Sequence, residues 1–362
     1  MFAYIVRRLL LMVPTLIGIM LINFVIINMA PGGPIEQLIA NLRAEGGKVA
    51  DRIGGGEGAE VRSSQERGLE SRAGRGLDPD LLKKLQAQLH LDKPVHERFV
   101  LMLKNYALFD FGQSFFKNRP VVDLVLEKMP VSISLGLWTT LITYLVCIPL
   151  GIKKAIRDGS KFDAWSSGVI VFGAAIPSFL FALLLIIVFA SGNFLSWFPL
   201  RGLVSDNWAR LPLGEKIVDY FWHIALPVLA MVIGSFATLT LLTKNSFLEE
   251  IRKQYVVTAR AKGLAERRVL YGHVFRNAML IVIAGFPGAF IGILFTGSFL
   301  IEVMFTLDGL GYLGFEALTN RDYPIVFATL YFFSLIGLLV RLISDLTYVL
   351  IDPRIDFEAR GG

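Results

Sequence analysis

The sequence predicts an all-α integral membrane protein with six transmembrane helices, both termini in the cytoplasm, and a helical external insertion between the first two helices. Three observations predict this class. The mean hydropathy is +0.59, and only 18% of the 362 residues are charged, whereas soluble domains carry about 25%. The apolar residues gather in runs near the length of about 20 residues that spans a bilayer as a helix. Basic residues are concentrated in alternate loops, as is typical of multi-pass membrane proteins.

Six apolar runs are expected to span the membrane. The first run, 9–29, follows Arg7 and Arg8 and could therefore be a secretory signal peptide. Its apolar stretch is longer than the roughly 7–15 residues of a signal core, and the following "INMAPGGP" lacks a small-x-small cleavage site, which favours an uncleaved helix. The remaining runs are 131–152, 165–190, 222–243, 278–300 and 325–350. Each of the first five runs contains a proline, which predicts a local kink in its helix.

The basic residues of the short loops set the expected orientation. Loop 153–164 carries four lysines and arginines and loop 244–277 carries eight, whereas 191–221 has three and 301–324 has one. The positive-inside rule therefore places the first two loops and both termini in the cytoplasm. The net charge of +6 is explained by these loops and does not require a nucleic acid partner.

Residues 31–130 form the expected external segment, between a first part (1–30) and a membrane core (131–362) that holds the other five runs. Within this segment, 41–80 contains nine glycines and no aromatic residue, so it cannot bury a core and is expected to be a disordered linker. From Asp80 the pattern changes: Asp80 is a candidate N-cap, and the leucines of "DLLKKLQAQLHL" have helical spacing. We therefore expect a small helical subdomain over 80–130.

The chemistry of an enzyme is missing from the sequence. It contains no phosphate-binding G-x-x-x-x-G-K-[ST], no H-E-x-x-H and no G-x-S-x-G motif, so we expect neither a catalytic residue nor a metal site or cofactor in this chain. The single cysteine, Cys147, excludes an internal disulfide. The first five runs contain no acidic residue, which argues against a proton-driven carrier. The sixth holds Arg341 and Asp345 at i,i+4, expected to be a structural intramembrane pair.

Loop 244–277 is basic and lies between two of the most apolar runs. Its pattern predicts two short helices that break at Gly263, because glycine readily ends a helix in a left-handed conformation. Such an element is suited to docking into a groove of another protein. A basic loop resting on anionic lipid is an equally good interpretation of the composition.

The motifs of this loop resemble those of a known transporter family. "VTARAKG", followed by "HVFRNA", is similar to the cytoplasmic loop of ABC importer permeases, and more narrowly to the dipeptide/oligopeptide branch. The general E-A-A-x-x-x-G pattern of such importers is replaced at its first three positions by Val257, Thr258 and Ala259, which fits the branch. "IEVMFTLDGLGYLG", "RDYPIV" and "DLTYVLIDPR" also resemble the branch. The tail "DPRIDFEARGG" and the linker 41–80 are most similar to the B subunits of Yej-type importers, associated with microcin C and other peptides.

The resemblance implies a permease subunit of a binding-protein-dependent importer that moves peptides across the inner membrane by alternating access. It implies a second permease subunit, two ATP-binding subunits or domains that hold ATP and magnesium, and a periplasmic peptide-binding protein. The loop would then dock on the ATP-binding partner. The expected docking residues are Tyr255, Val257, Thr258, Ala259, Arg260, Ala261, Lys262, Gly263, Leu264 and Arg268.

Two other classes remain as alternatives to this interpretation. A six-helix secondary transporter or channel would work without an ATPase partner and would need paired charges at a midplane site. An integral membrane enzyme would need a Ser/His or Asp pair at membrane depth, and the apolar runs offer none.

Overall fold

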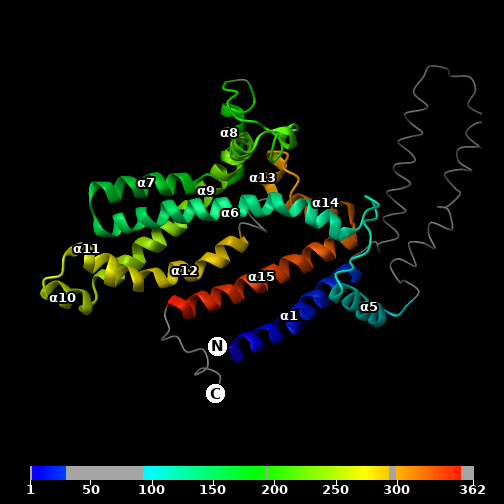
Figure 1. The fold of residues 1–362 in the computed structure, drawn as a ribbon, viewed down its shortest axis with the longest axis horizontal. Coiled ribbons are helices and arrows are strands. Elements are labelled where there is room, and N and C mark those ends of the chain that lie inside the picture. The colour runs from blue at the N-terminus through cyan, green and yellow to red at the C-terminus, as the bar shows by residue number, and fades with distance from the viewer. Residues whose placement is uncertain (1, 30–92, 193, 293–298, 352–362) are drawn as a thin grey trace, which may run out of the picture. The chain divides into compact units, whose positions relative to one another are not determined.

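The computed structural model describes residues 2–29, 93–192, 194–292 and 299–351 (Figure 1). In these ranges the regular elements are helices, with one isolated antiparallel bridge between Gln113 and Pro120. The predicted linker 41–80 and the helix expected from Asp80 lie outside the described residues. The chain divides into two compact units, Met1–Val13 with Leu124–Glu316 and Phe332–Gly362, and Pro14–Asp123 with Ala317–Tyr331.

The apolar runs form helices long enough to cross a membrane. Five helical stretches qualify singly, and one bent pair of helices brings the number of candidate spans to six. The all-helical, multi-pass class is thereby confirmed. The helices of the five single stretches are α1 (Phe2–Met29), α6 (Val121–Ile156), α9 (Leu213–Ile251), α12 (Phe275–Gly292) and α15 (Tyr323–Ile351).

The run 165–190, predicted to be a single helix, is broken in the middle. Helix α7 (Lys161–Ala175) and helix α8 (Ser178–Phe189) meet at an angle of 91°. Pro177 has no backbone N–H and disfavours helical geometry in the residue before it. Ile176 accordingly adopts an extended conformation with ψ 118°, and Pro177 becomes the N-cap of α8. The proline expected to kink a span therefore divides it into two helices.

Helix α9 is the central helix of the first unit and packs against α7, α8 and α12. It also meets α6 closely at Gly151. A Cβ atom at Gly151 would lie 2.6 Å from the Cβ of Thr243 and 2.8 Å from the carbonyl oxygen of Thr240. Small residues permit such close backbone approach between membrane helices, so Gly151 fixes the crossing of α6 and α9.

Short helices connect the long ones: η1 (Trp208–Arg210), α13 (Phe299–Met304) and α14 (Leu310–Asn320).

A buried carboxylate holds the segment around α13. Glu302 is fully buried, and its Oε1 accepts from Ser132 Oγ at 2.8 Å while its Oε2 accepts from the backbone N–H of Tyr312 at 2.7 Å. Ser132 Oγ also accepts from the N–H of Leu310 at 2.8 Å.

The second unit contains α5 (Val95–Ala107), with parts of α1 and α15. Its interior is aromatic: the rings of Tyr106 and Phe111 lie 4.5 Å apart and that of Tyr331 lies 5.4 Å from Phe111. Asp322 accepts a hydrogen bond from Ser114 Oγ. Burial raises the pKa of Asp322 above its ordinary value, which is the usual effect of desolvation on a carboxyl group.

Candidate functional site

The connection between α9 and α12 begins with the separate helix α10 (Gln254–Ala261), which lies at one end of the first unit in Figure 1. Gly263 follows in a left-handed conformation with φ +79°. Its N–H donates to the carbonyl of Arg260 at 2.9 Å, and the N–H of Leu264 donates to that of Ala259 at 3.4 Å. These two bonds form the Schellman motif that ends helices at glycine. The predicted helix break at Gly263 is therefore present.

The second predicted short helix is continuous with a membrane span. Helix α11 (Glu266–Arg268) leads directly into a π-helical segment, η2 (Val269–Val274), which continues as α12. The stretch from Glu266 to Gly292 is long and apolar enough to be one span. Only α10 is thus a free-standing short helix in this connection.

Helix α10 has an inner and an outer face. On the inner face, Val256 is fully buried and Ala259, three residues later, is also buried. They pack in a cluster with side chains of α6, α9, η2 and α12, including Phe247, Val269 and Ala278. A helix of eight residues is too short to be stable alone, so this packing holds α10 in place.

Polar contacts fix both ends of α10. Tyr255 Oη donates to Glu250 Oε2 of α9 at 2.7 Å. Burial and the Glu250 carboxylate raise the pKa of Tyr255 to about 12, so this phenol remains a donor at neutral pH. At the other end of α10, Arg260 binds Glu266, which follows the glycine, through two hydrogen bonds, Nη2 to Oε1 at 2.6 Å and Nε to Oε2 at 3.1 Å. This fork spans the turn and fixes the angle at which the chain leaves α10.

The ten residues expected to dock divide between the two faces. Ala259 is buried, and Tyr255 and Leu264 are partly buried against the cluster under α10. The side chain of Val257 is 51% exposed although it is apolar. The other exposed residues are Thr258, Arg260, Ala261, Lys262, Gly263 and Arg268. The outer face of α10 is therefore a small surface of mixed apolar and basic character.

A buried charge network, which was missed in the sequence, supports the neighbouring end of the unit. Lys154 has 0% exposure, and its Nζ donates to the carbonyl of Asp163 at 2.9 Å, Ser166 Oγ at 2.8 Å and Ser167 Oγ at 2.7 Å. The Asp163 carboxylate binds both Lys154 Nζ at 3.0 Å and Lys244 Nζ of α9 at 2.7 Å. The available signal was the Ser-x-x-Asp capping pattern that begins at Ser160.

The expected pair of Arg341 and Asp345 is replaced by another. Asp345 lies 2.9 Å from Arg8 of α1, through Oδ2 and Nη2, while the side chain of Arg341 is exposed. The i,i+4 spacing indicated a charged partner for Asp345, but that partner comes from the other end of the chain.

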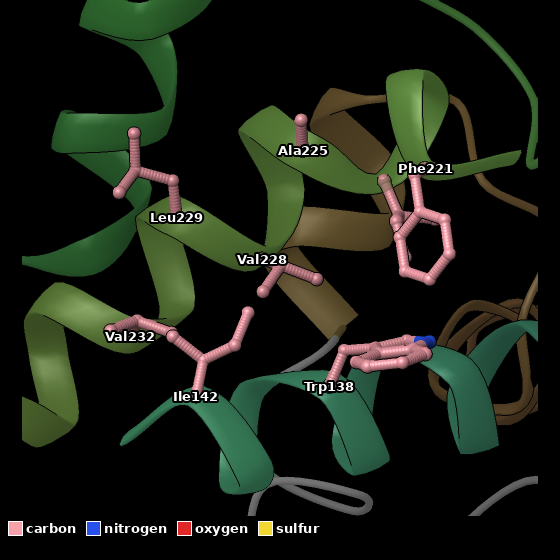
Figure 2. A pocket seen from close by; sticks show the side chains of 8 residues that line it. Trp138, Ile142, Phe221, Ala225, Val228, Leu229 and Val232 are labelled. Atoms are coloured by element: carbon pink, nitrogen blue, oxygen red, sulfur yellow. The ribbon is translucent and has the colours of Figure 1, made fainter. Parts of the chain in front are cut away.

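An apolar pocket of about 350 Å³ lies between α6 and α9 (Figure 2). Trp138 and Ile142 of α6 face side chains of α9 such as Val228 and Leu229. This lining carries no acid, base or metal ligand. In all the ranges that the structure describes, no three His, Cys, Asp or Glu side chains are grouped as a metal site.

Comparison with known proteins places the chain in a family. Residues 147–357 match the family model of the binding-protein-dependent transport system inner membrane component. The chain is 61% identical over 360 residues to the peptidoglycan transport system permease protein YejB of Agrobacterium fabrum, covering 99% of each. It is 57% identical to the inner membrane ABC transporter permease protein YejB of Escherichia coli O157:H7, over 99% of this chain and all of the relative.

More distant relatives agree with this assignment. The chain is 32% identical to the oligopeptide transport system permease protein AppB of Bacillus subtilis, over 99% of this chain and all of the relative. These matches replace the alternatives of a secondary transporter and a membrane enzyme. The chain therefore belongs to the family of binding-protein-dependent transport system inner membrane components, the multi-pass, non-enzymatic permease subunits of ABC importers.

Proposed function

We propose that this chain is one permease half of a peptide importer and that the outer face of α10 docks on the ATP-hydrolysing partner. The observation that carries the proposal is a short helix with an exposed outer face, fixed to the core at both ends, in a permease without its own ATPase. Relatives named for peptidoglycan, oligopeptide and dipeptide transport support peptides as the cargo. Peptides of the microcin C kind fall within this class.

The proposed assembly has several partners. A second, related permease completes the pathway, two ATP-binding subunits or domains hold ATP and magnesium, and a periplasmic protein delivers the peptide. The termini and the connection with α10 lie in the cytoplasm, where ATP is available, and residues 31–130 lie outside. The excess of basic residues in loops 153–164 and 244–277 supports this orientation.

The contacts of α10 suggest how a motion of the partner reaches the membrane helices. Val256 and Ala259 pack on side chains of α9, η2 and α12. Close-packed side chains transmit displacement, because protein interiors are dense and little compressible. A push on α10 is thus carried to two spans at once. In alternating access, ATP binding and release in the partner would use this connection to bias the pathway between its inward and outward states.

A bulky substitution on the outer face tests the docking role. Ala261 is exposed near the end of α10, so Ala261→Trp leaves the core contacts intact and obstructs only a bound partner. We expect association with the ATP-binding subunits to weaken by about tenfold or more, the scale of disrupting the centre of an interface, and peptide uptake into proteoliposomes to fall with it.

The matched control is Ala107→Trp, at an exposed residue at the end of α5. This variant should retain its ATP-binding subunits and its uptake. Unchanged association and uptake in Ala261→Trp would exclude the docking role of α10. If only removal of the basic charges of the loop had an effect, the lipid-surface interpretation would replace it.

A further inference from the structure

A second cavity, of about 180 Å³, lies in the unit that contains α5. Its wall combines charged, amide and aromatic side chains from three helices and the turn after α5. Arg98 and Asn105 come from α5, Asp110 from the turn, Phe24 from α1, and Tyr323 and Phe327 from α15. A cavity that presents a cation, a carboxylate and aromatic rings is suited to a small ligand with both charges.

Arg98 has unused hydrogen-bonding capacity in this cavity. Its Nε is buried, and no acceptor for it occurs among the described residues. The guanidinium carbon lies 5.9 Å from the ring centroid of Phe24, within range of a cation–π contact. Burial lowers the pKa of Arg98 below its ordinary value, which reflects the cost of desolvating the cation. A buried donor without an acceptor is costly, so an acceptor from a bound ligand would stabilise this site.

Asp110 supplies the opposite charge. Its Oδ1 accepts from the N–H of Gly112 at 3.0 Å, which fixes the carboxylate at the edge of the cavity. Both Arg98 and Asp110 line the wall of the cavity, and no ion pair joins them among the described residues. Two opposite charges held apart in one cavity match a ligand that carries an anionic and a cationic group.

The position of the cavity relative to the spans indicates where the ligand comes from. Phe24 lies near the end of the span Tyr4–Ile26, and Tyr323 begins the span Tyr323–Thr347. The rings of Phe24 and Phe327 lie 6.3 Å apart, so both helix ends meet the cavity at one membrane boundary. Phospholipid headgroups occupy this level of a bilayer.

Helix α5 exposes apolar and polar side chains together. Val95 and Val100 are exposed, as are Lys104, one turn from Val100, and Leu108 at the C-cap. An exposed surface of this mixed kind suits the boundary between headgroups and acyl chains. An acyl chain in contact with α5 would place the attached headgroup beside Arg98.

We propose that this cavity binds the headgroup of a zwitterionic aminophospholipid, with the phosphate on Arg98 and the primary ammonium on Asp110 and the aromatic rings. The guanidinium offers the planar set of donors that phosphate oxygens accept. The ammonium is attracted by the carboxylate and by the ring faces. A primary ammonium also donates N–H hydrogen bonds to the Asp110 carboxylate, which the quaternary ammonium of phosphatidylcholine cannot do, and phosphatidylglycerol has no amine. A lipid with a phosphate and a primary amine is therefore preferred over both.

Native mass spectrometry of the full chain in mild detergent tests this binding. The protein is offered equal amounts of phosphatidylethanolamine, phosphatidylglycerol and phosphatidylcholine. The unmodified chain should retain phosphatidylethanolamine preferentially. Arg98→Gln should reduce its retention by about tenfold or more, the scale of one lost hydrogen bond to a charged group. Asp110→Asn should reduce the preference for phosphatidylethanolamine over phosphatidylcholine.

Two further variants separate binding from folding. Lys104→Gln removes the same charge from the exposed side of α5 and should leave lipid retention unchanged. Arg98→Lys keeps the charge without the planar fork and should retain an intermediate amount of lipid. Equal retention by Arg98→Gln and the unmodified chain would overturn the proposal. Equal loss in Lys104→Gln, or displacement of the lipid by a soluble tripeptide with a free carboxylate, would overturn it as well.

Discussion

Replacing Gly309 by alanine is expected to destabilise the first unit, although the change adds a single methyl group. A Cβ atom at this position would lie 2.5 Å from both Cδ and Oε1 of Glu302 and 2.7 Å from its Oε2. Real Cβ atoms do not approach other heavy atoms this closely, so the carboxylate would have to move. Because Glu302 is fully buried, it cannot move into water.

The cost follows from the hydrogen bonds that hold the carboxylate. Moving it breaks the bond from Ser132 Oγ at 2.8 Å and the bond from the Tyr312 N–H at 2.7 Å. A hydrogen bond to a charged group contributes about 1.5–3 kcal/mol. The loss of both predicts a decrease in the free energy of unfolding of about 3 kcal/mol or more.

The chain contains its own reporter for this measurement. Cys147 is the single cysteine and is buried, so a thiol-reactive fluorescent dye reacts with it only when the protein unfolds. The midpoint of a thermal scan in detergent should be lower for Gly309→Ala than for the unmodified chain. Gly288→Ala is the control, because a Cβ atom there meets nothing within 4 Å.

Non-additivity distinguishes this steric cause from a general loss of fold. If Gly309→Ala acts through Glu302, then adding it to Glu302→Ala should cost little more than Glu302→Ala alone, as coupled neighbours behave. A Gly309→Ala protein that melts with the control would refute the reasoning. Full additivity of the two substitutions would refute it too.

Three further outcomes are expected. Gly263→Val forces a β-branched residue into a left-handed conformation at a cost of about 1–2 kcal/mol. The variant should still insert into the membrane but should retain less of the ATP-binding subunits in a pull-down assay. Normal association would contradict the role of the turn. Lys154→Met leaves a buried carboxylate without one partner and should lower the free energy of unfolding by about 3–5 kcal/mol, whereas the exposed Lys153→Met should change it little in the same dye assay. Lys161→Cys should react with membrane-impermeant reagents only from the cytoplasmic side, and Asn207→Cys should react only from outside. The reverse pattern of labelling would invert the proposed topology.

The long helices and the glycine turn could be predicted from the sequence, because both depend on local information. Runs of apolar residues are long enough to span a bilayer wherever they fold. Gly263 ends a helix for reasons confined to its own backbone. The break at Ile176 and Pro177 was missed, because prolines also occur inside unbroken membrane helices and the hydropathy of the run is continuous across it.

The charged contacts could not be predicted, since they depend on tertiary packing. Lys154 is one of the basic residues of loop 153–164 by which the sequence predicts the orientation, yet it is buried among hydroxyl groups of α7. Asp345 has a basic residue four positions away, but it binds Arg8 from the opposite end of the chain. The sequence places Tyr255 and Ala259 in the loop between two spans. It does not show that both face inward, because that depends on the cluster of side chains beneath α10.

The π-helical segment at the entrance to α12 has a consequence for how this region tolerates length changes. Its buried side chains Val269 and Val274 are five positions apart, an interval that suits i→i+5 hydrogen bonding and would put them on different sides of an ordinary helix. The segment therefore holds one surplus residue. Deleting that residue would give a regular α-helical turn without rotating α12 about its axis. A deletion within α12 itself would instead rotate the residues before the deletion by about 100° relative to those after it.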